Sequence, residues 1–520
     1  MYQKGNMAVG GAVPEGELAD CVMNIRLATG DHAHSVVENG ALTFDKDYEQ
    51  WVNEHQKLIN DLRTASNSPV DKDNDDDLHN VVEGVRAHYD ELFRLKSKGT
   101  KADVFHMFFG MWKTPAERCF MWLGGFRPSE LLKILRKQLE PFAGQQLMEL
   151  YNLQQSSMMG EEALSQGMDA LQGILSEILS SSSTSLGSTS SANSAKYDIM
   201  ELARSKLLNL QDFLPVADNL RQQTLRQLQR ILTTRQAARA FLLINDYISQ
   251  LRNNLCRLAH QNQVAKRKCR SEEKGTLIAI EYPEDHCRSV VRNGALAFDK
   301  DYEHWLDEHQ RVINNLRTAF NSQMGDNDEL HTTIVAVTSH YDELFRLKNI
   351  GTKADVFHML SGAWKTPLER CFMWLAGFRS SDLLKIVRDQ LEPLTEDQLI
   401  GLYNLQQSSF QAEDALSQAM GMLHQNLSET LSSSAASLGP TGCGNVAQHM
   451  DQMALGMKNL DSLEAILHQA DILRQQILNQ QLPRILTMRQ VARAFLVIND
   501  YISRIRNVKC GSCPVIDSKL

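Results

Sequence analysis

A long internal repeat is the feature that most constrains what this chain can fold into. Three pairs of nearly identical segments carry it: 39–51 and 293–305, 88–96 and 340–348, and 241–249 and 495–503. The units of solenoid proteins span roughly 20 to 50 residues, whereas this repeat is several times longer. The sequence therefore predicts two copies of one duplicated domain.

Composition sets the class of protein. The 520 residues carry a net charge of -9, and 42% of them are hydrophobic, which is enough to bury a core in each copy. The mild acidity argues against the whole chain acting as a non-specific nucleic-acid binder, while a local basic patch stays allowed. Nine cysteines form no dense framework, which favours a reducing compartment. Because no secretory signal or apolar run of about 20 residues is visible, we expect a soluble intracellular protein without membrane contact.

Apolar residues recur at helical spacing in both copies. Trp51, His55, Leu58 and Leu62 follow the pattern i, i+4, i+7, i+11, which predicts an amphipathic helix. The acidic stretch 71–77 is predicted to be a solvated loop. A second helix is expected over 81–95, with a break at 99–100 and a third helix over 101–111. All histidines on these helices (His55, His88 and His106, with His309, His340 and His358) are interpreted as core residues rather than ligands.

The densest aromatic block is 112–127, which returns as 364–379. Thr114 is predicted to cap a helix whose first turn contains Pro115. Helical spacing then places one buried face on the following residues: Cys119, Trp122, Leu123 and Phe126. The helix is expected to end near 124–125. No nucleophile–base pair is visible, so we interpret the block as core.

The remaining segments are also predicted to be helical. One helix opens at Pro128, a long amphipathic one covers 147–179, and a last helical region covers 220–251. The Met-rich part of the long helix, 158–179, is interpreted as core in preference to a lipid groove. Pro483, which replaces Gln229 in the second copy, is expected to kink or restart its helix. A short β-like pattern occurs only at 276–282.

These patterns predict an all-α fold of two homologous multi-helix bundle domains in tandem, with flexible Ser-rich loops at 180–194 and 432–444. The predicted segments follow in chain order: 1–34, a disordered N-terminal segment; 35–256, the first domain; 257–286, a short irregular linker; 287–508, the second domain; and 509–520, a tail. Cys510 and Cys513 in the tail have CxxC spacing, but no second ligand pair accompanies them. The sequence therefore predicts no metal site.

Five motifs resemble the delay-of-germination-type domain at the C-terminus of plant TGA factors, the bZIP proteins that bind TGACG elements. They lie at 88–96, 101–106, 112–115, 152–157 and 234–240. The resemblance covers most of the chain as two copies. It implies a domain that dimerises, either between chains or between the two copies of one chain. It also implies docking of other TGA bZIP factors and of ankyrin-repeat salicylate-response coactivators, in plant defence. Some members bind haem or a fatty acid, and no other cofactor is expected.

Residues 257–270 are similar to the basic region of that family. They keep its spacing between Asn262 and Arg270, and the cations Lys266, Arg267 and Lys268 stand between these two. In such a region the asparagine reads base edges while the cations hold phosphates. No leucine heptad follows Arg270, so we interpret the segment as a remnant. The three central cations also match a nuclear-import signal, which predicts a nuclear protein, with the cytoplasm as a second location.

Three functions follow from these patterns. The leading hypothesis is a non-enzymatic transcription regulator that acts through helical dimerisation and co-regulator docking. The first alternative is direct sequence-specific binding to TGACG elements through the remnant basic region. The second is a sensor of haem or a fatty acid. An enzyme is not expected, because the sequence offers no activated nucleophile, no phosphate-binding glycine loop and no catalytic residue.

Overall fold

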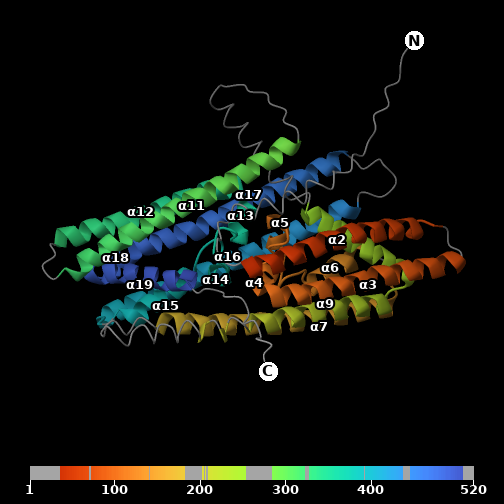
Figure 1. Ribbon diagram of the computed structural model, residues 1–520, viewed down its shortest axis with the longest axis horizontal. Coiled ribbons are helices and arrows are strands. Elements are labelled where there is room, and N and C mark those ends of the chain that lie inside the picture. Colours follow the sequence, from red (N-terminus) through yellow and green to blue (C-terminus); the bar gives the residue numbers. More distant parts are fainter. Residues whose placement is uncertain are drawn as a thin grey trace, which may run out of the picture.

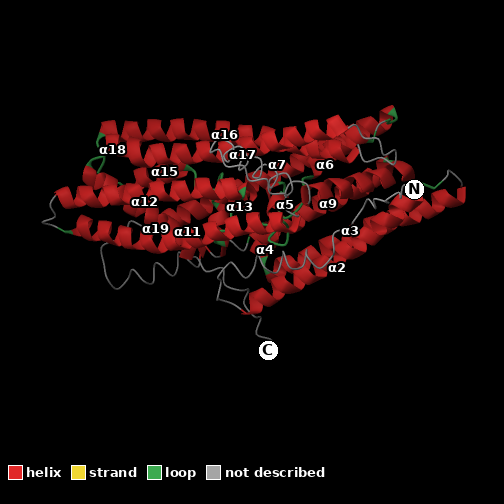
Figure 2. Cartoon of the chain, turned by 90° about the horizontal axis from the view of Figure 1, so that it is seen from above, coloured by secondary structure: helices red, strands yellow, loops and turns green. Residues whose placement is uncertain are grey.

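The predicted all-α fold is confirmed. The computed structural model describes residues 35–68, 72–139, 141–181, 202–203, 205–206, 209–252, 284–322, 327–391, 393–436 and 446–507. Within these ranges the chain forms helices and no strand (Figure 2). The only β-type pairing within these ranges consists of two isolated bridges, Trp122 with Gly125 and Trp374 with Gly377. Helices of the described ranges are all too short or too polar to cross a membrane.

The helices of the first copy are α2 (Ser35–Ser66), α3 (Lys72–Ala102), α4 (Val104–Phe108), α5 (Pro115–Cys119), α6 (Pro128–Gln138), α7 (Gly144–Ser181), α9 (Leu210–Ile231) and a helix over 234–252. Those of the second copy are α11 (Glu284–Asn321), α12 (Asn327–Ala354), α13 (Val356–Ser361), α14 (Pro367–Cys371), α15 (Ser380–Gln390), α16 (Glu396–Ala436), α17 (Val446–Gln476), the π-helix η2 (Ile477–Gln481), α18 (Leu482–Ile485) and α19 (Met488–Asn507). The same order of elements therefore occurs twice.

The molecule is elongated, and its long helices run roughly along the long axis (Figure 1). The first copy, red to olive, occupies one end, and the second copy, green to blue, occupies the other. In each copy the first two long helices pack along each other, α2 against α3 and α11 against α12. The copies meet in the middle, where α13 contacts α5 and α19 contacts α7.

Each hydrophobic core takes side chains from both copies. The core of the first copy includes Phe372, which directly follows α14, and Tyr501 and Ile505 from α19. The core of the second copy includes Ala116 from α5 and Tyr247 from the helix over 234–252. Because burial of apolar surface is the main force that stabilises a domain, the two copies stabilise each other.

Two of the predicted breaks are wrong. The acidic stretch 71–77 is not a loop, because α3 already begins at Lys72. Carboxylates at a helix N-terminus are favoured by the helix dipole. The helix also continues through Gly99 and Thr100 to Ala102. A Cβ on Gly99 would lie 2.8 Å from the ring of Phe44, so this glycine permits close packing rather than ending the helix.

The helix after Pro115 is shorter than predicted. Thr114 does cap it with a capping box, and Pro115 does occupy its first turn. However, α5 ends at Cys119, and the chain turns where Leu123 and Gly124 have positive φ angles of 43° and 71°. The predicted helical face over Cys119, Trp122, Leu123 and Phe126 is therefore wrong, and these four side chains are only half-buried.

The prediction for Pro483 is confirmed. The five-residue π-helix η2 directly precedes α18, where this proline stands in the first turn. Proline cannot donate the backbone hydrogen bond of a regular helix, and the wider π turn adjusts the spacing before the helix restarts. The last helical region of the first copy is also divided, because Leu232 at the end of α9 is extended.

Several predicted segments lie outside the described residues. They are 1–34, 257–270 with Asn262, Lys266, Arg267, Lys268 and Arg270, the β-like 276–282, most of the two Ser-rich stretches, and the tail with Cys510 and Cys513. The domain boundaries stay predictions.

Candidate functional site

A stack of three rings joins α2 to α3 in the first copy. Trp51 lies between His55 and His88, with ring centroids 4.7 Å from each and nearly parallel planes. The indole N–H of Trp51 donates to the carbonyl oxygen of His88 at 2.8 Å. The same stack recurs in the second copy around Trp305, between His309 and His340. These histidines therefore take part in helix packing.

The loop before α5 is held by Arg118. Its Nε donates to the carbonyl oxygens of Gly110 and Lys113, and Nη2 donates to that of Met111. A buried guanidinium with several backbone acceptors fixes a loop better than one contact would. The loop in turn positions Lys113 over the ring of Tyr48, with 4.9 Å between its ammonium and the ring centroid.

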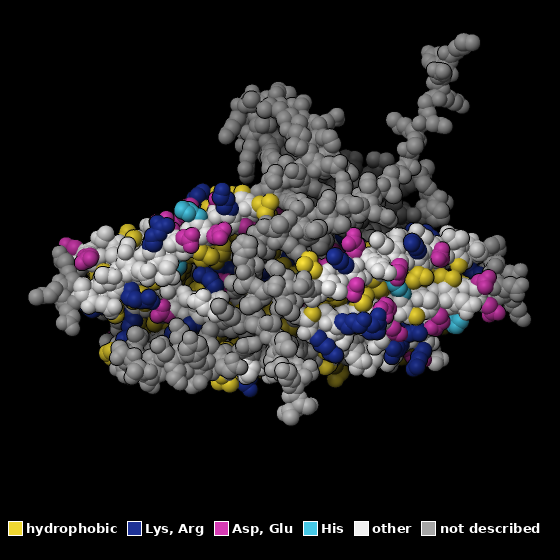
Figure 3. All heavy atoms as spheres, in the orientation of Figure 1, with side chains coloured by type: hydrophobic (Ala, Val, Ile, Leu, Met, Phe, Trp, Pro, Cys, Tyr) yellow, Lys and Arg dark blue, Asp and Glu magenta, His cyan; other side chains and the backbone are white. Residues whose placement is uncertain are grey.

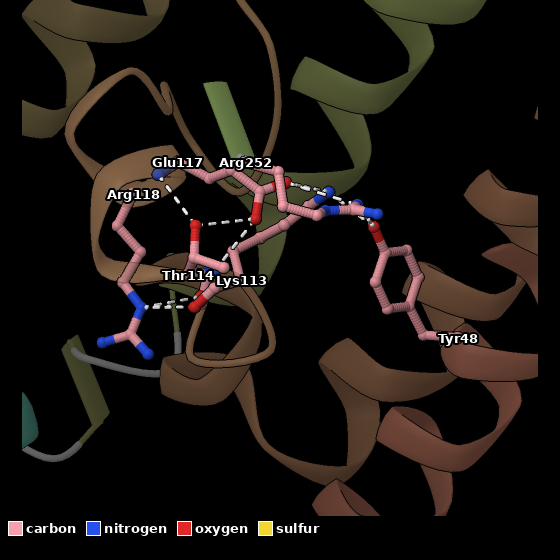
Figure 4. Close-up of polar contacts among 7 residues, drawn as sticks. Tyr48, Lys113, Thr114, Glu117, Arg118 and Arg252 are labelled. Atoms are coloured by element: carbon pink, nitrogen blue, oxygen red, sulfur yellow. Dashed lines mark hydrogen bonds and ion pairs between the residues drawn. The ribbon is translucent and has the colours of Figure 1, made fainter. Parts of the chain in front are cut away.

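Glu117 lies at the centre of a buried polar network, shown in Figure 4. Its carboxylate accepts hydrogen bonds from the Thr114 backbone at 3.0 Å, from Lys113 at 3.1 Å and from Arg252 at 3.4 Å. Burial alone would raise the pKa of Glu117, but the charges of Lys113 and Arg252, with the bond from Thr114, outweigh it and lower this pKa to about 2. The carboxylate is therefore ionised at neutral pH.

A second buried network lies close by. Asp218 of α9 accepts hydrogen bonds from Lys96 of α3 and from Arg221, the latter at 2.6 Å. Arg221 is fully buried and also donates to the carbonyl oxygens of Phe126 and Leu123. Burial lowers the pKa of Lys96 to about 8, even though Asp218 opposes this shift. Both networks pair two cations with one carboxylate.

The buried side chain of Arg221 leaves room only for a glycine at position 125 of the aromatic block. A Cβ on Gly125 would lie 2.8 Å from the guanidinium carbon of Arg221, so any larger residue would displace it. Gly377 and Arg474 repeat this relationship in the second copy at 2.7 Å. The turn after α5 is therefore tied to α9, and in the second copy to α17, by a buried arginine.

A cavity of about 320 Å³ opens beside the two networks of the first copy. Its wall includes Lys96, Lys113, Glu117, Arg221 and Arg252, and His424 of the second copy closes one side. The aromatic rings in the wall are Tyr48, Trp51, Tyr89, Phe93, Trp112, Phe120, Trp122, Phe126 and Tyr247. The corresponding cavity of the second copy encloses only about 100 Å³. A volume of a few hundred Å³ with few polar groups is typical of small-molecule sites.

The copies contact each other reciprocally. Tyr247 donates a hydrogen bond to Ser428 of the second copy, and Tyr501 bonds with Ser176 of the first copy. Because Ser428 corresponds to Ser176 and Tyr501 to Tyr247 in the repeat, this is the pattern of a two-fold symmetric interface. The two copies therefore contact each other through equivalent residues.

Comparison with known proteins identifies the family. The seed dormancy control (DOG1) family model matches residues 58–137 and 312–389, which run from α2 to α6 and from α11 to α15. The rice transcription factor TGAL3 (Oryza sativa subsp. japonica) is 53% identical over 281 residues, which are 54% of this chain and 72% of that protein. The chain belongs to the family of TGA-type transcription factors.

Two other TGA relatives match this chain with similar identity and over a similar length. Transcription factor PERIANTHIA of Arabidopsis thaliana is 55% identical over 289 residues, 55% of this chain and 62% of that protein. The TGACG-sequence-specific DNA-binding protein TGA-2.1 of Nicotiana tabacum is 52% identical over 281 residues, 54% of this chain and 60% of that protein. The chain thus spans less than two thirds of the length of these two relatives.

The face of this TGA-type chain in Figure 3 mixes both signs of charge. Lysine and arginine side chains alternate with aspartate and glutamate over the described helices, without a broad basic area on this face. The residues predicted to contact DNA, Asn262, Lys266, Arg267, Lys268 and Arg270, lie outside the described ranges.

The two ligands implied by the resemblance have different requirements. In the part of the chain that is described, no group of three or more His, Cys, Asp or Glu side chains is placed to hold a metal ion. His55 stacks on Trp51 and packs edge-on against Tyr89, and its Nδ1 is fully buried. His55 also lines the cavity of the first copy, and binding of haem stays a prediction. Binding of a fatty acid stays a prediction.

Sequence analysis missed most of this site. Lys113 and Glu117 belong to the aromatic block, but Tyr48, Lys96, Asp218 and Arg252 were not singled out. One signal was available: Lys96 and Asp218 have the counterparts Lys348 and Asp471, so the same two charged residues recur in both copies. Spacing alone did not show which lysine meets which aspartate.

Proposed function

We propose that this chain regulates transcription in the nucleus as a non-enzymatic TGA-type protein. In this proposal the two copies pair within the chain, and their outer helices dock co-regulator proteins. The names of the relatives support a role in transcription. The reciprocal contacts of Tyr247 with Ser428 and of Tyr501 with Ser176 support pairing of the copies in place of separate subunits.

The observation that carries docking is a stripe of exposed apolar side chains that occurs twice. On α7 it consists of Leu147, Met148, Tyr151 and Met158, and on α16 of their counterparts Leu399, Ile400, Tyr403 and Phe410. Residues at i, i+1, i+4 and i+11 share one helix face. Tyr151 is 48% exposed and Tyr403 is 52% exposed. Large apolar side chains grouped at the surface are typical of protein-binding faces.

Binding measurements with two purified partners test this function: a full-length TGA bZIP factor and an ankyrin-repeat salicylate-response coactivator. We expect association at micromolar concentration with at least one of them. The double variant Tyr151→Ser, Tyr403→Ser should weaken it about tenfold or more, because exposed tyrosines are frequent binding hot spots. Ile350→Ser is the matched control, since Ile350 is 52% exposed on α12, outside both stripes.

Two results would contradict the proposal. One is the absence of association with either partner at micromolar concentration. The other is a double variant that binds as well as the Ile350→Ser control. Light scattering of the purified chain adds an independent check, because internal pairing of the copies predicts the mass of one chain at the same concentrations.

The name of the tobacco relative favours direct DNA binding as a second candidate function. In this alternative Asn262 contacts bases, while Lys266, Arg267, Lys268 and Arg270 contact phosphates. It predicts a footprint on TGACG sites with a steep dependence on salt concentration. Asn262→Ala should remove the preference for TGACG over scrambled DNA, and equal affinity of the unmodified chain for both sequences would eliminate this function.

A further inference from the structure

Arg252 is a buried cation with unused hydrogen-bonding capacity. Among the described residues, only its Nη2 makes hydrogen bonds, to Tyr48 at 3.3 Å and to Glu117 at 3.4 Å. The side chain is 18% exposed and lines the cavity of the first copy. A guanidinium presents a planar fork of donors that matches a carboxylate. The remaining donors of Arg252 are therefore available to an anion in the cavity.

The charge around the cavity also favours an anion. Lys113 and Arg252 share Glu117, and Lys96 and Arg221 share Asp218, so each network carries one more cation than carboxylates. An uncompensated buried charge is costly, and a nearby opposite charge offsets that cost. Besides Glu117, the wall contains the carboxylate of Glu130. This residue is exposed to solvent and has no ion pair among the described contacts.

The apolar part of the wall indicates the shape of the ligand. Aromatic rings surround the cavity, among them Trp51 and Trp112 of the first copy. Phe120 meets His424 of the second copy with ring centroids 5.2 Å apart. Aromatic faces favour flat rings in offset or edge-on contact over alkyl chains of the same size. We propose that this cavity binds a compact aromatic carboxylate, with Arg252 as the anchor of the carboxylate.

The cavity of the second copy is less suited to this ligand. Its volume is about 100 Å³, against about 320 Å³ in the first copy. Arg506, the counterpart of Arg252, lies closer to its glutamate, at 3.1 Å from Glu369. The side chain that closes the first cavity, His424, corresponds to Gln172 in the repeat. The structure therefore assigns one site to each chain rather than two.

Isothermal titration calorimetry of the full-length chain tests the site with three probes. They are 2-naphthoate, the uncharged 2-naphthalenemethanol, and undecanoate, an aliphatic carboxylate with as many carbons as 2-naphthoate. We expect 2-naphthoate to bind with a stoichiometry of one and more tightly than the other two. Arg252→Gln should weaken its binding about tenfold or more, which is the usual effect of losing a hydrogen bond to a charged group.

Two further variants keep the test decisive. Arg252→Lys retains the charge beside Glu117 and should fold normally, yet it loses the fork and should also bind 2-naphthoate more weakly. Arg506→Gln changes the counterpart in the second copy and should leave the affinity unchanged. Binding of two molecules, tighter binding of undecanoate or of the alcohol, or equal effects of Arg252→Gln and Arg506→Gln would each overturn the proposal, as would no binding of 2-naphthoate.

Discussion

Tyr247 of the first copy donates its hydroxyl hydrogen to Ser428 of the second copy, with 3.2 Å between the two oxygens. The relationship is repeated in reverse by Tyr501 and Ser176 at 3.1 Å. Burial raises the pKa of both tyrosines to about 12, so both hydroxyls are neutral at physiological pH. The two bonds mark the interface at which the duplicated copies complete each other's cores.

Removing these hydroxyls should weaken the packing of the copies. Tyr247→Phe leaves the buried hydroxyl of Ser428 without this partner, so we expect it to lower the free energy of unfolding by about 1–3 kcal/mol. Tyr501→Phe should cost about 1 kcal/mol, because Ser176 is only half-buried. Urea unfolding measures both changes, and a double variant as stable as the parent chain would contradict the interface.

The turn after α5 and its counterpart differ in one residue that carries backbone strain. Gly124 has a φ of +71°, whereas Ala376 at the equivalent place has a φ of +58°. Left-handed backbone costs a non-glycine residue about 1–3 kcal/mol. We therefore expect Ala376→Gly to raise the free energy of unfolding by about 1 kcal/mol, as measured by thermal or urea unfolding.

The converse substitution, Gly124→Ala, should destabilise the chain by more than that gain. A Cβ at this position would lie 2.9 Å from the carbonyl oxygen of Met107, so a steric clash adds to the unfavourable φ. If both substitutions changed the stability in the same direction, strain at this turn would not be the explanation.

Two histidines should make the fold sensitive to acid. Burial, together with the charges of neighbouring cations, lowers the pKa of His55 to about 3, and that of His309 likewise. Between about pH 6.5 and 3 the unfolded chain binds these protons while the folded chain does not, so the free energy of unfolding falls as the pH falls. Each histidine contributes up to about 1.4 kcal/mol per pH unit.

Urea unfolding between pH 7 and pH 5 measures this effect above the range in which Glu117 and Glu369 titrate. Burial also lowers the pKa of His340 and His424, which contribute in the same direction, so the variant below identifies the share of His55 and His309. The double variant His55→Gln, His309→Gln loses the ring stacking and should be less stable at pH 7. Its stability should nevertheless depend less on pH than that of the parent chain. An unchanged slope would show that these two histidines are not the groups that titrate.

The buried network around Asp218 should be critical for stability. Asp218→Asn leaves Lys96 and Arg221 without a carboxylate in a buried place, and breaking a buried ion pair typically costs about 3–5 kcal/mol. Glu91→Gln is the control, since it removes a partner of Arg94 on the surface and should change the stability very little. Chemical unfolding of both variants compares them, and similar losses would refute the role of burial.

The helical nature of both copies was predictable from sequence, as were the beginnings of α5 and α6. Thr114 and Pro115 specify the start of α5, because capping depends on residues within one turn. The apolar period of α2 and α6 predicts their buried faces, since that pattern reflects the helix itself. Predictions were wrong where a residue is required by a contact with a distant part of the chain. Gly99 was interpreted as a helix end, but a glycine is needed there because the ring of Phe44 packs against it.

Repetition and helical periodicity are properties of neighbouring residues, so the amino-acid sequence was enough to predict that the chain is helical and duplicated, and that α5 and α6 begin at Pro115 and Pro128. Only the tertiary structure decided that Arg252 meets Glu117, 135 positions earlier, and that Tyr247 and Tyr501 cross between the copies. These contacts depend on how the faces of separate helices pack. How deeply each charged group or hydroxyl is buried then determines its free-energy cost. The spacing of residues along the chain does not show that depth.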